Sequence, residues 1–180
     1  ALVASVLQYS DPVHKVSIIS RGQAAGYTLK MPETEKYLRF KSEYLDNLSA
    51  LLAGYAAESA IFNDVTTGAS NDLQEATKLA KKLVTEYGMS AKLGTRTFGL
   101  KEELIFLGRG ISEQKDYSEK TAEIIDGEVS NFIDSCYNKA KEIIQKKRNK
   151  LDQITNLLLE KESLESDEFE AIFKEDKKIC

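Results

Sequence analysis

The chain has 180 residues and a mass of 20.1 kDa, enough for one domain with a buried core. It carries 25 Lys and Arg against 29 Asp and Glu, and the net charge of −4 argues against a nucleic acid or an anionic membrane surface as the main partner. A hydrophobic content of 42% is typical of a soluble globular protein, and no stretch approaches the roughly 18 apolar residues of a membrane span.

The first 40 residues predict a short helix followed by a β-hairpin. Residues 1–7 are small and apolar and begin without a capping residue, as in the second half of a longer helix. The β-branched run 13–19 predicts a strand. The segment 27–31 alternates, and its apolar positions are Tyr27, Leu29 and Met31. We expect these strands to form a hairpin with one face on a core and an edge that is exposed or in use.

From residue 42 onwards, the apolar residues recur with a helical period. Residues 42–62 predict a helix whose apolar stripe consists of Leu45, Leu48, Leu51, Leu52, Tyr55 and Phe62. A loop rich in turn-forming residues follows, and we expect Ser70 or Asn71 to cap a second helix, which Gly88 ends. Residues 89–116 then form an irregular stretch with four glycines.

The last third of the chain is predicted to be nearly all helix. Ser118 begins a long helix with apolar residues at three- and four-residue steps. The charged run 146–150 interrupts this stripe and contains no aromatic residue, which indicates a solvated helix end and not a nucleic-acid patch. Residues 151–159 resume an apolar face, and an acidic tail leads to a short turn around Phe169.

These elements predict a mainly α fold with a small β-hairpin near the N-terminus. We expect a single domain over residues 1–180. Its successive parts are residues 1–40 with the helix and hairpin, 42–88 with the core helices, an irregular stretch over 89–117, and the C-terminal helices over 118–180.

Asp72 is the residue that helical spacing singles out. It lies four residues before Ala76, at the N-terminal end of the buried stripe and near the positive end of the helix dipole. One interpretation is a cap or dipole partner, the usual role of Asp in a first turn. The other is an inward carboxylate that accepts hydrogen bonds or binds a cation. Glu58 lies between Tyr55 and Phe62 on an apolar line, where spacing alone favours a position at the boundary of the core.

Other residues give no site of their own. The only histidine, His14, predicts a structural role, because one imidazole cannot close a usual zinc site. Cys136 and Cys180 are too few for a disulfide framework and favour a reducing compartment. Gly22 and Gly26 form no phosphate-binding loop, because neither the glycine spacing nor a following Lys-Ser/Thr is present.

The string Thr66-Thr-Gly-Ala-Ser-Asn-Asp-Leu73 is the most specific motif of the sequence. It is accompanied in chain order by Asp11–Val16, Arg21-Gly22 with Gly26, Ala56–Glu58, Val84–Met89, Phe106–Gly108 and Tyr117-Ser118. Together these segments cover most of the chain and resemble the peptidase domain of the FtsH-type AAA metalloproteases, the membrane-anchored ATP-dependent zinc proteases of bacteria, mitochondria and chloroplasts.

The resemblance implies a helical metallopeptidase domain with a zinc ion. In the family, two histidines of a His-Glu-x-x-His helix and an Asp of the Ser-Asn-Asp-Leu segment hold the zinc, and that Asp corresponds to Asp72. Glu58 becomes a candidate for the shell around the metal. The His-Glu-x-x-His helix is expected immediately upstream of Ala1. Because both histidines and the general-base Glu are absent from the 180 residues, we expect an incomplete zinc site and a chain that is neither metallated nor proteolytic alone.

The resemblance also implies substrates and partners. Extended substrates pair with a strand edge, since main-chain hydrogen bonds recognise any sequence, and the candidate positions are Val16, Ile18, Gly26 and Thr28. The parent protein is expected to be a homo-hexamer whose separate ATPase module uses ATP to feed unfolded or membrane proteins to the peptidase ring. Membrane segments absent here would anchor it, with the peptidase domain in a cytoplasmic or organellar compartment and this chain soluble. The alternative is a non-catalytic relative that keeps the helical scaffold for oligomerisation or partner binding.

Overall fold

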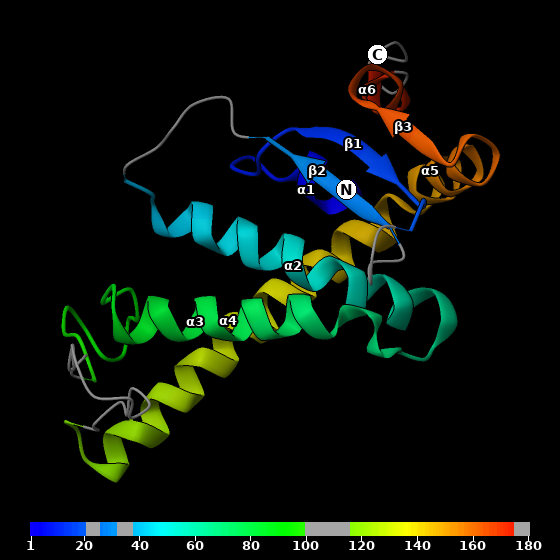
Figure 1. The fold of residues 1–180 in the computed structure, drawn as a ribbon. Helices are drawn as coiled ribbons and strands as arrows, with labels where there is room; N and C mark the ends of the chain where they lie inside the picture. Colours follow the sequence, from blue (N-terminus) through cyan, green and yellow to red (C-terminus); the bar gives the residue numbers. More distant parts are fainter. Residues whose placement is uncertain (21–25, 32–37, 100–115, 175–180) are drawn as a thin grey trace, which may run out of the picture.

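The computed structural model describes residues 1–20, 26–31, 38–99 and 116–174, and it confirms a mainly helical fold with a small antiparallel sheet (Figure 1). The helices are α1 (Leu2–Val6), α2 (Lys41–Phe62), the 3₁₀ turn η1 (Thr67–Ala69), α3 (Ser70–Thr85), α4 (Glu119–Lys146), α5 (Arg148–Lys161) and α6 (Ser166–Lys174). The strands are β1 (Val13–Ser17), β2 (Tyr27–Lys30) and β3 (Ser163–Glu165). None of the helices in these described ranges combines the length and apolarity that a membrane crossing requires.

Helices α2, α3 and α4 form a helical body around one apolar core. Its fully or almost fully buried residues are Leu48, Leu52, Ala76, Ala80, Leu83 and Cys136. Local hydrogen bonds fix where two of the helices begin. The Phe40 N–H donates to Glu43 Oε2 at 2.7 Å, and the Thr121 N–H donates to Ser118 Oγ at 3.3 Å, which makes Ser118 the N-cap of α4.

Two predictions about the helical body were wrong. Phe62 is 71% exposed, because helical periodicity indicates which face is apolar but not how far along that face the neighbouring helices reach. Neither Ser70 nor Asn71 caps α3, whose N-cap is Ala69 without a side-chain hydrogen bond. The chain enters α3 directly from η1, so the capping hydroxyl belongs to Thr66, which accepts from the Gly68 N–H at 3.1 Å. Gly88 follows α3 in the left-handed region (φ 61°), which agrees with its predicted role.

Helix α1 is buried from two sides through Leu2, Val3 and Ala4, while Ser5 and Val6 are exposed. Leu2 and Ala4 pack against the sheet and the C-terminal helices, whereas Val3 and Leu7 pack against α2 and α4. In Figure 1, α1 accordingly lies between the sheet and α2. On the opposite side of α2 runs α3, so the start of the chain is placed at the centre of the fold (Figure 1).

The sheet differs from the predicted hairpin in having a third strand. Its order is β2-β1-β3, and both pairings are antiparallel (Figure 1). A register shift between Val13 and Lys15 allows both Val13 and Val16 to be buried, against strict alternation. The expected apolar face of β2 was wrong, since Leu29 is 44% and Met31 50% exposed. Strand β2 is thus held by its pairing to β1 rather than by burial of its own side chains.

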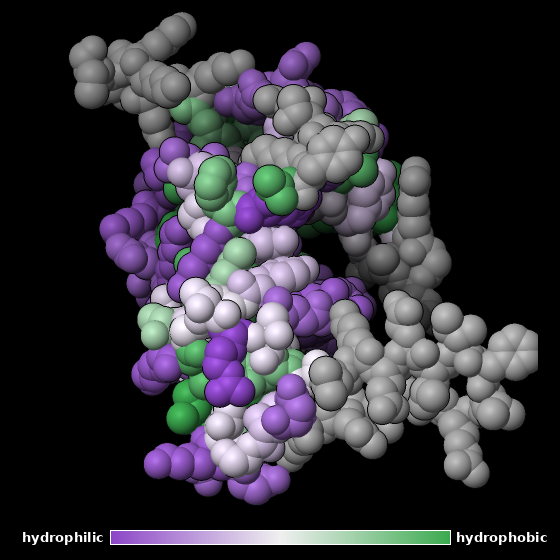
Figure 2. Space-filling view, turned by 90° about the vertical axis from the view of Figure 1, so that its left-hand side faces the viewer, coloured by the Kyte–Doolittle hydropathy of each residue, from purple (hydrophilic) through white to green (hydrophobic). Residues whose placement is uncertain are grey.

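The C-terminal region contains a second core. Helices α5 and α6 enclose Ile154, Leu158, Phe169 and Ile172 together with residues of α1 and β1. The break between α4 and α5 falls at Lys147, inside the predicted interruption. That run is not a fully solvated helix end, because Lys150 is buried and its Nζ donates to the Ile172 carbonyl at 2.6 Å. On the face shown in Figure 2, outside the grey residues, hydrophobic residues lie scattered among hydrophilic ones.

Candidate functional site

A pocket of about 540 Å³ lies where the start of the chain, α2, the sheet and the start of α3 meet. Its lining includes Ala1, Val16, Ser17, Gly26, Thr28, Lys30, Gly54, Ala57 and Asp72. The pocket therefore brings Asp72 together with three of the four substrate-strand candidates. The fourth, Ile18, follows the end of β1, is 43% exposed and does not line this pocket.

Asp72 lies in the first turn of α3 with its side chain exposed to solvent. It is thus not the buried inward carboxylate that the stripe indicated, because it faces an open pocket and not a closed core. Asp72 and Ala1 nevertheless line the same pocket, so the first turn of α3 and the beginning of the described chain lie around one cavity.

Glu58 fixes the loop that leads to Asp72. Its half-buried carboxylate accepts the Thr66 N–H at 2.7 Å and the Thr66 hydroxyl at 3.1 Å. The same hydroxyl accepts the Gly68 N–H at the start of η1, which continues into α3. One carboxylate on α2 thus holds the loop and, through η1, the first turn of α3. Glu58 does not line the pocket itself. It is connected to the site only through Thr66.

The sheet side of the pocket is formed by β1 and β2. Strand β1 is central and pairs on both sides, so Val16 offers no free backbone edge. Among the described residues, β2 pairs with β1 alone, which leaves its outer side as an edge next to the pocket. Thr28, directly opposite Val16 in the register, is exposed on this strand. Of the two edge strands among the described residues, β2 and β3, only β2 lines the pocket.

Gly26 occupies a position where only a glycine fits without movement. A Cβ atom built there would lie 2.6 Å from the Ser17 carbonyl oxygen and 3.2 Å from the Ile18 Cα. Real Cβ atoms do not approach backbone oxygen so closely. The close approach of Gly26 to the end of β1 thus sets where β2 begins.

Some lining residues were missed in the sequence. Helix α2 presents Ala50, Ala53, Gly54 and Ala57 to the pocket, a spacing of i, i+3, i+4 and i+7. This small-residue stripe could have been found from spacing alone, because it lies beside the larger apolar stripe. Lys30 and Ser17 carried no comparable signal, since their positions depend on how β2 and β1 pair.

The described residues do not assemble a complete metal site. Among them, no three side chains of His, Cys, Asp or Glu come together closely enough to hold a metal ion. Asp72 has the oxygen donor that zinc accepts, but one carboxylate does not satisfy a tetrahedral zinc ion. His14 lies on β1 and does not line the pocket. Among the described residues, the pocket therefore offers one candidate zinc ligand, Asp72, and not a complete zinc site.

Comparison with known proteins shows the family to which the chain belongs. The model of peptidase family M41 matches residues 1–172. Proteins named ATP-dependent zinc metalloprotease FtsH 1 from Sphaerobacter thermophilus and Thermomicrobium roseum are 47% and 49% identical over 97% of this chain. The ATP-dependent zinc metalloprotease FtsH of Thermotoga maritima is 48% identical over 98% of it. The chain spans only 27% to 29% of the length of these relatives. It belongs to peptidase family M41 and is an FtsH-type peptidase domain.

Proposed function

We propose that these residues form part of the active site of an ATP-dependent zinc endopeptidase, with Asp72 as a zinc ligand. The observation that carries the proposal is the common pocket of Asp72, Ala1 and β2. A ligand at Asp72 and a metal-binding helix that continues into Ala1 would meet at this pocket. Bound zinc would supply Lewis-acid activation of water and of the substrate carbonyl.

The remaining ligands and the general base are proposed to lie outside the 180 residues. The sequence contains one histidine, His14, which is followed by Lys15 and so belongs to no His-Glu-x-x-His motif. We expect the isolated chain to bind no stoichiometric zinc and to hydrolyse no peptide. Metal analysis and a peptide-cleavage assay on the isolated chain test this. About one equivalent of zinc together with hydrolysis would refute it.

The proposed substrate is an extended, unfolded polypeptide that adds to the outer edge of β2. Backbone pairing suits substrates of any sequence, and β2 is the sheet edge that adjoins Asp72 in the pocket. The names of the relatives support dependence on ATP, which we assign to a module outside these residues. A homo-hexameric ring and a membrane anchor in the parent protein belong to the same proposal.

Substitution of Asp72 tests the ligand assignment. In the complete gene product, Asp72→Asn should lower zinc content and peptide hydrolysis together. The loss of zinc affinity should be at least as large as the loss of about 10- to 100-fold that is typical when a ligand loses an outer partner. Glu75→Gln is the matched control, because Glu75 is exposed one turn along the same helix. Zinc content and hydrolysis that survive Asp72→Asn would refute the assignment. A wild-type protein that neither binds zinc nor cleaves peptide would favour the non-catalytic scaffold.

A second pair of variants tests whether Glu58 positions Asp72. Thr66→Val removes the hydroxyl that donates to Glu58, whereas Thr66→Ser retains it. This contact reaches Asp72 only through the loop and η1, so we expect Thr66→Val to weaken zinc binding by no more than about 10-fold, the lower limit seen for direct partners of a metal ligand. Thr66→Ser should behave as the wild type. Equal zinc affinity in the two variants would show that the loop contact has no part in the site.

A further inference from the structure

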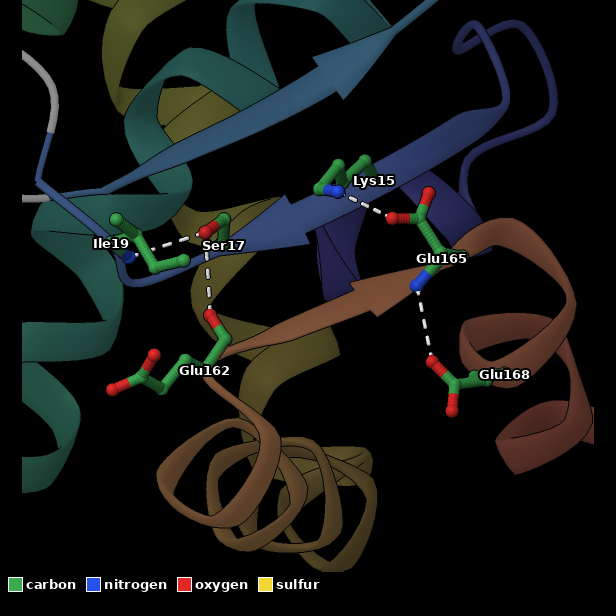
Figure 3. A network of polar contacts seen from close by, with 6 residues as sticks. All are labelled: Lys15, Ser17, Ile19, Glu162, Glu165 and Glu168. Carbon is green, nitrogen blue, oxygen red and sulfur yellow. Dashed lines mark hydrogen bonds and ion pairs between the residues drawn. The ribbon is translucent and has the colours of Figure 1, made fainter.

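The end of β1 is held by the end of α5, a helix far away in the sequence. Ser17 is the last residue of β1 and only 3% exposed. Its hydroxyl donates to the Glu162 carbonyl at 3.3 Å and accepts the Ile19 N–H at 3.2 Å (Figure 3). The next amide, that of Ile18, donates to the same carbonyl at 3.0 Å. One backbone oxygen thus receives two hydrogen bonds from the point where β1 ends.

Glu162 presents this carbonyl through its backbone conformation. It is the C-cap of α5 and adopts the left-handed region (φ 61°), which turns the chain from the helix into β3. Its carboxylate extends away from Ser17 in Figure 3. The contact therefore depends on the path of the backbone and not on the glutamate side chain.

The same residue of β1 also determines where β2 lies. Ser17 is paired with Tyr27 of β2 and with Ser163 of β3, so it stands at the junction of all three strands. Its carbonyl is the atom that Gly26 approaches too closely for any Cβ. Ser17 also lines the pocket that contains Asp72. A shift of the Ser17 backbone would consequently move the beginning of β2 and the rim of the pocket together.

Further contacts hold β3 in place, but they do not involve the junction of the three strands at Ser17. Lys15 forms an ion pair with Glu165, and the Glu165 N–H donates to Glu168 Oε2 at 3.3 Å (Figure 3). The Glu165 side chain is largely exposed and that of Lys15 is half-buried, so solvent still screens their attraction in part. The hydroxyl of Ser17, in contrast, makes its hydrogen bonds at an almost fully buried position.

From this geometry we infer that Ser17 is a positioning residue for the substrate strand. Through its hydroxyl and the Glu162 carbonyl, the end of α5 fixes β1, and β1 fixes the edge of β2 on which an extended polypeptide pairs. The inference rests on the proposed function, because it takes β2 as the substrate edge. Ser17 touches neither the metal ligand nor the reacting atoms, so it should affect binding of the polypeptide and not the chemical step.

The test compares Ser17→Ala, Ser17→Thr and a matched control in the complete gene product. The control is Ser49→Ala, which also removes a fully buried hydroxyl, one that donates to the Leu45 carbonyl at 2.9 Å within α2. Cleavage of an unfolded polypeptide gives kcat and KM. Loss of the Ser17 hydroxyl should raise KM about threefold to tenfold with kcat unchanged. Ser17→Thr and Ser49→Ala should retain the wild-type KM.

Hydrogen exchange on the 180-residue chain gives an independent readout. Ser17→Ala should speed exchange of the amides of β2 and of Ile19 at least about threefold, while Ser17→Thr and Ser49→Ala leave β2 exchange unchanged. Unchanged exchange in β2 on loss of the hydroxyl would overturn the inference. So would an active Ser17→Ala enzyme whose KM equals that of wild type. An inactive wild-type enzyme would instead count against the proposed function, and the exchange of β2 would still decide whether Ser17 positions that strand.

Discussion

The helical body and the three-stranded sheet are stabilised in different ways. The core of α2, α3 and α4 is fully buried, and each helix supplies its own apolar stripe. The sheet consists of strands of three to five residues drawn from both ends of the chain, with Leu29 and Met31 largely exposed. Burial therefore dominates in the body and also holds β1 and β3, through Val13, Val16 and Leu164, whereas the edge strand β2 depends on hydrogen bonds and one close backbone approach. The pocket with Asp72 lies between the two regions.

The largest effect is expected in the core of the helical body. Leu52 is 2% exposed, and Leu52→Ala should lower the free energy of unfolding by about 2–5 kcal/mol, because it removes buried contacts and leaves a cavity. Leu159→Ala is the control, since Leu159 is 70% exposed and should cost less than about 0.5 kcal/mol. Urea unfolding followed by circular dichroism measures both. Equal losses of unfolding free energy in Leu52→Ala and Leu159→Ala would show that the helical body is not stabilised mainly by burial.

Gly26→Ala should disturb the sheet and leave the body folded. The new methyl group would overlap the Ser17 carbonyl, and relief of this contact should cost about 1–3 kcal/mol. Gly54→Ala is the matched control on the opposite wall of the same pocket. It meets no atom within 4 Å and lies inside a helix, so it should stabilise the protein by about 0.5–1 kcal/mol. Thermal unfolding should shift in opposite directions for the two variants.

Glu128 provides a pH-dependent contribution in the helical body. The Ser90 hydroxyl, at 2.7 Å, is the main cause that lowers the pKa of this buried carboxyl, with help from Asn131 and Lys92. Because the folded pKa lies below the ordinary value of 4.5, the stabilisation is complete above about pH 4.5 and is lost as the pH falls through the folded pKa. Glu128→Gln should cost about 1.5 kcal/mol at pH 7 and flatten the acid limb of the stability profile.

Glu168→Gln, beside the sheet, is the control for this pH dependence. A hydrogen bond from Lys161 lowers the pKa of Glu168, but the Glu168 side chain is 41% exposed. Glu168→Gln should therefore leave the midpoint of urea unfolding unchanged between pH 4 and 7, since an exposed ion pair is screened. If Glu168→Gln lost more stability than Glu128→Gln as the pH changes, the larger pH-dependent contribution would lie beside the sheet and not in the helical body.

A small effect is expected at Glu162, because only its backbone carbonyl contacts the end of β1. A glycine tolerates the left-handed conformation without strain, so Glu162→Gly should be neutral or stabilising by less than about 1 kcal/mol. Hydrogen exchange of β2 should remain as in wild type. A clear destabilisation would show that the glutamate side chain, and not only its carbonyl, holds the end of α5.

The sequence indicated the candidate site better than it indicated the sheet. Spacing alone selected Asp72 and Glu58, because both lie on helices whose faces follow from a local period. It left the surroundings of Asp72 open between a cap, a buried carboxylate and a cation ligand. The structure shows an exposed Asp72 that lines one pocket with Ala1, and a Glu58 that binds the preceding loop. That Asp72 holds zinc, with Glu58 in the shell around the metal, stays a prediction.

By itself, the sequence determined the helices and the points where they end, since Gly88 and the break at Lys147 act through local backbone geometry. It did not determine that β3 pairs with β1, because Lys15 and Glu165 are 150 residues apart and no local period reports such a partner. Only the tertiary structure decided that Lys150 is buried and that Ser17 meets Glu162. A local pattern sets which face of an element is apolar, whereas the neighbour that covers it depends on the whole chain.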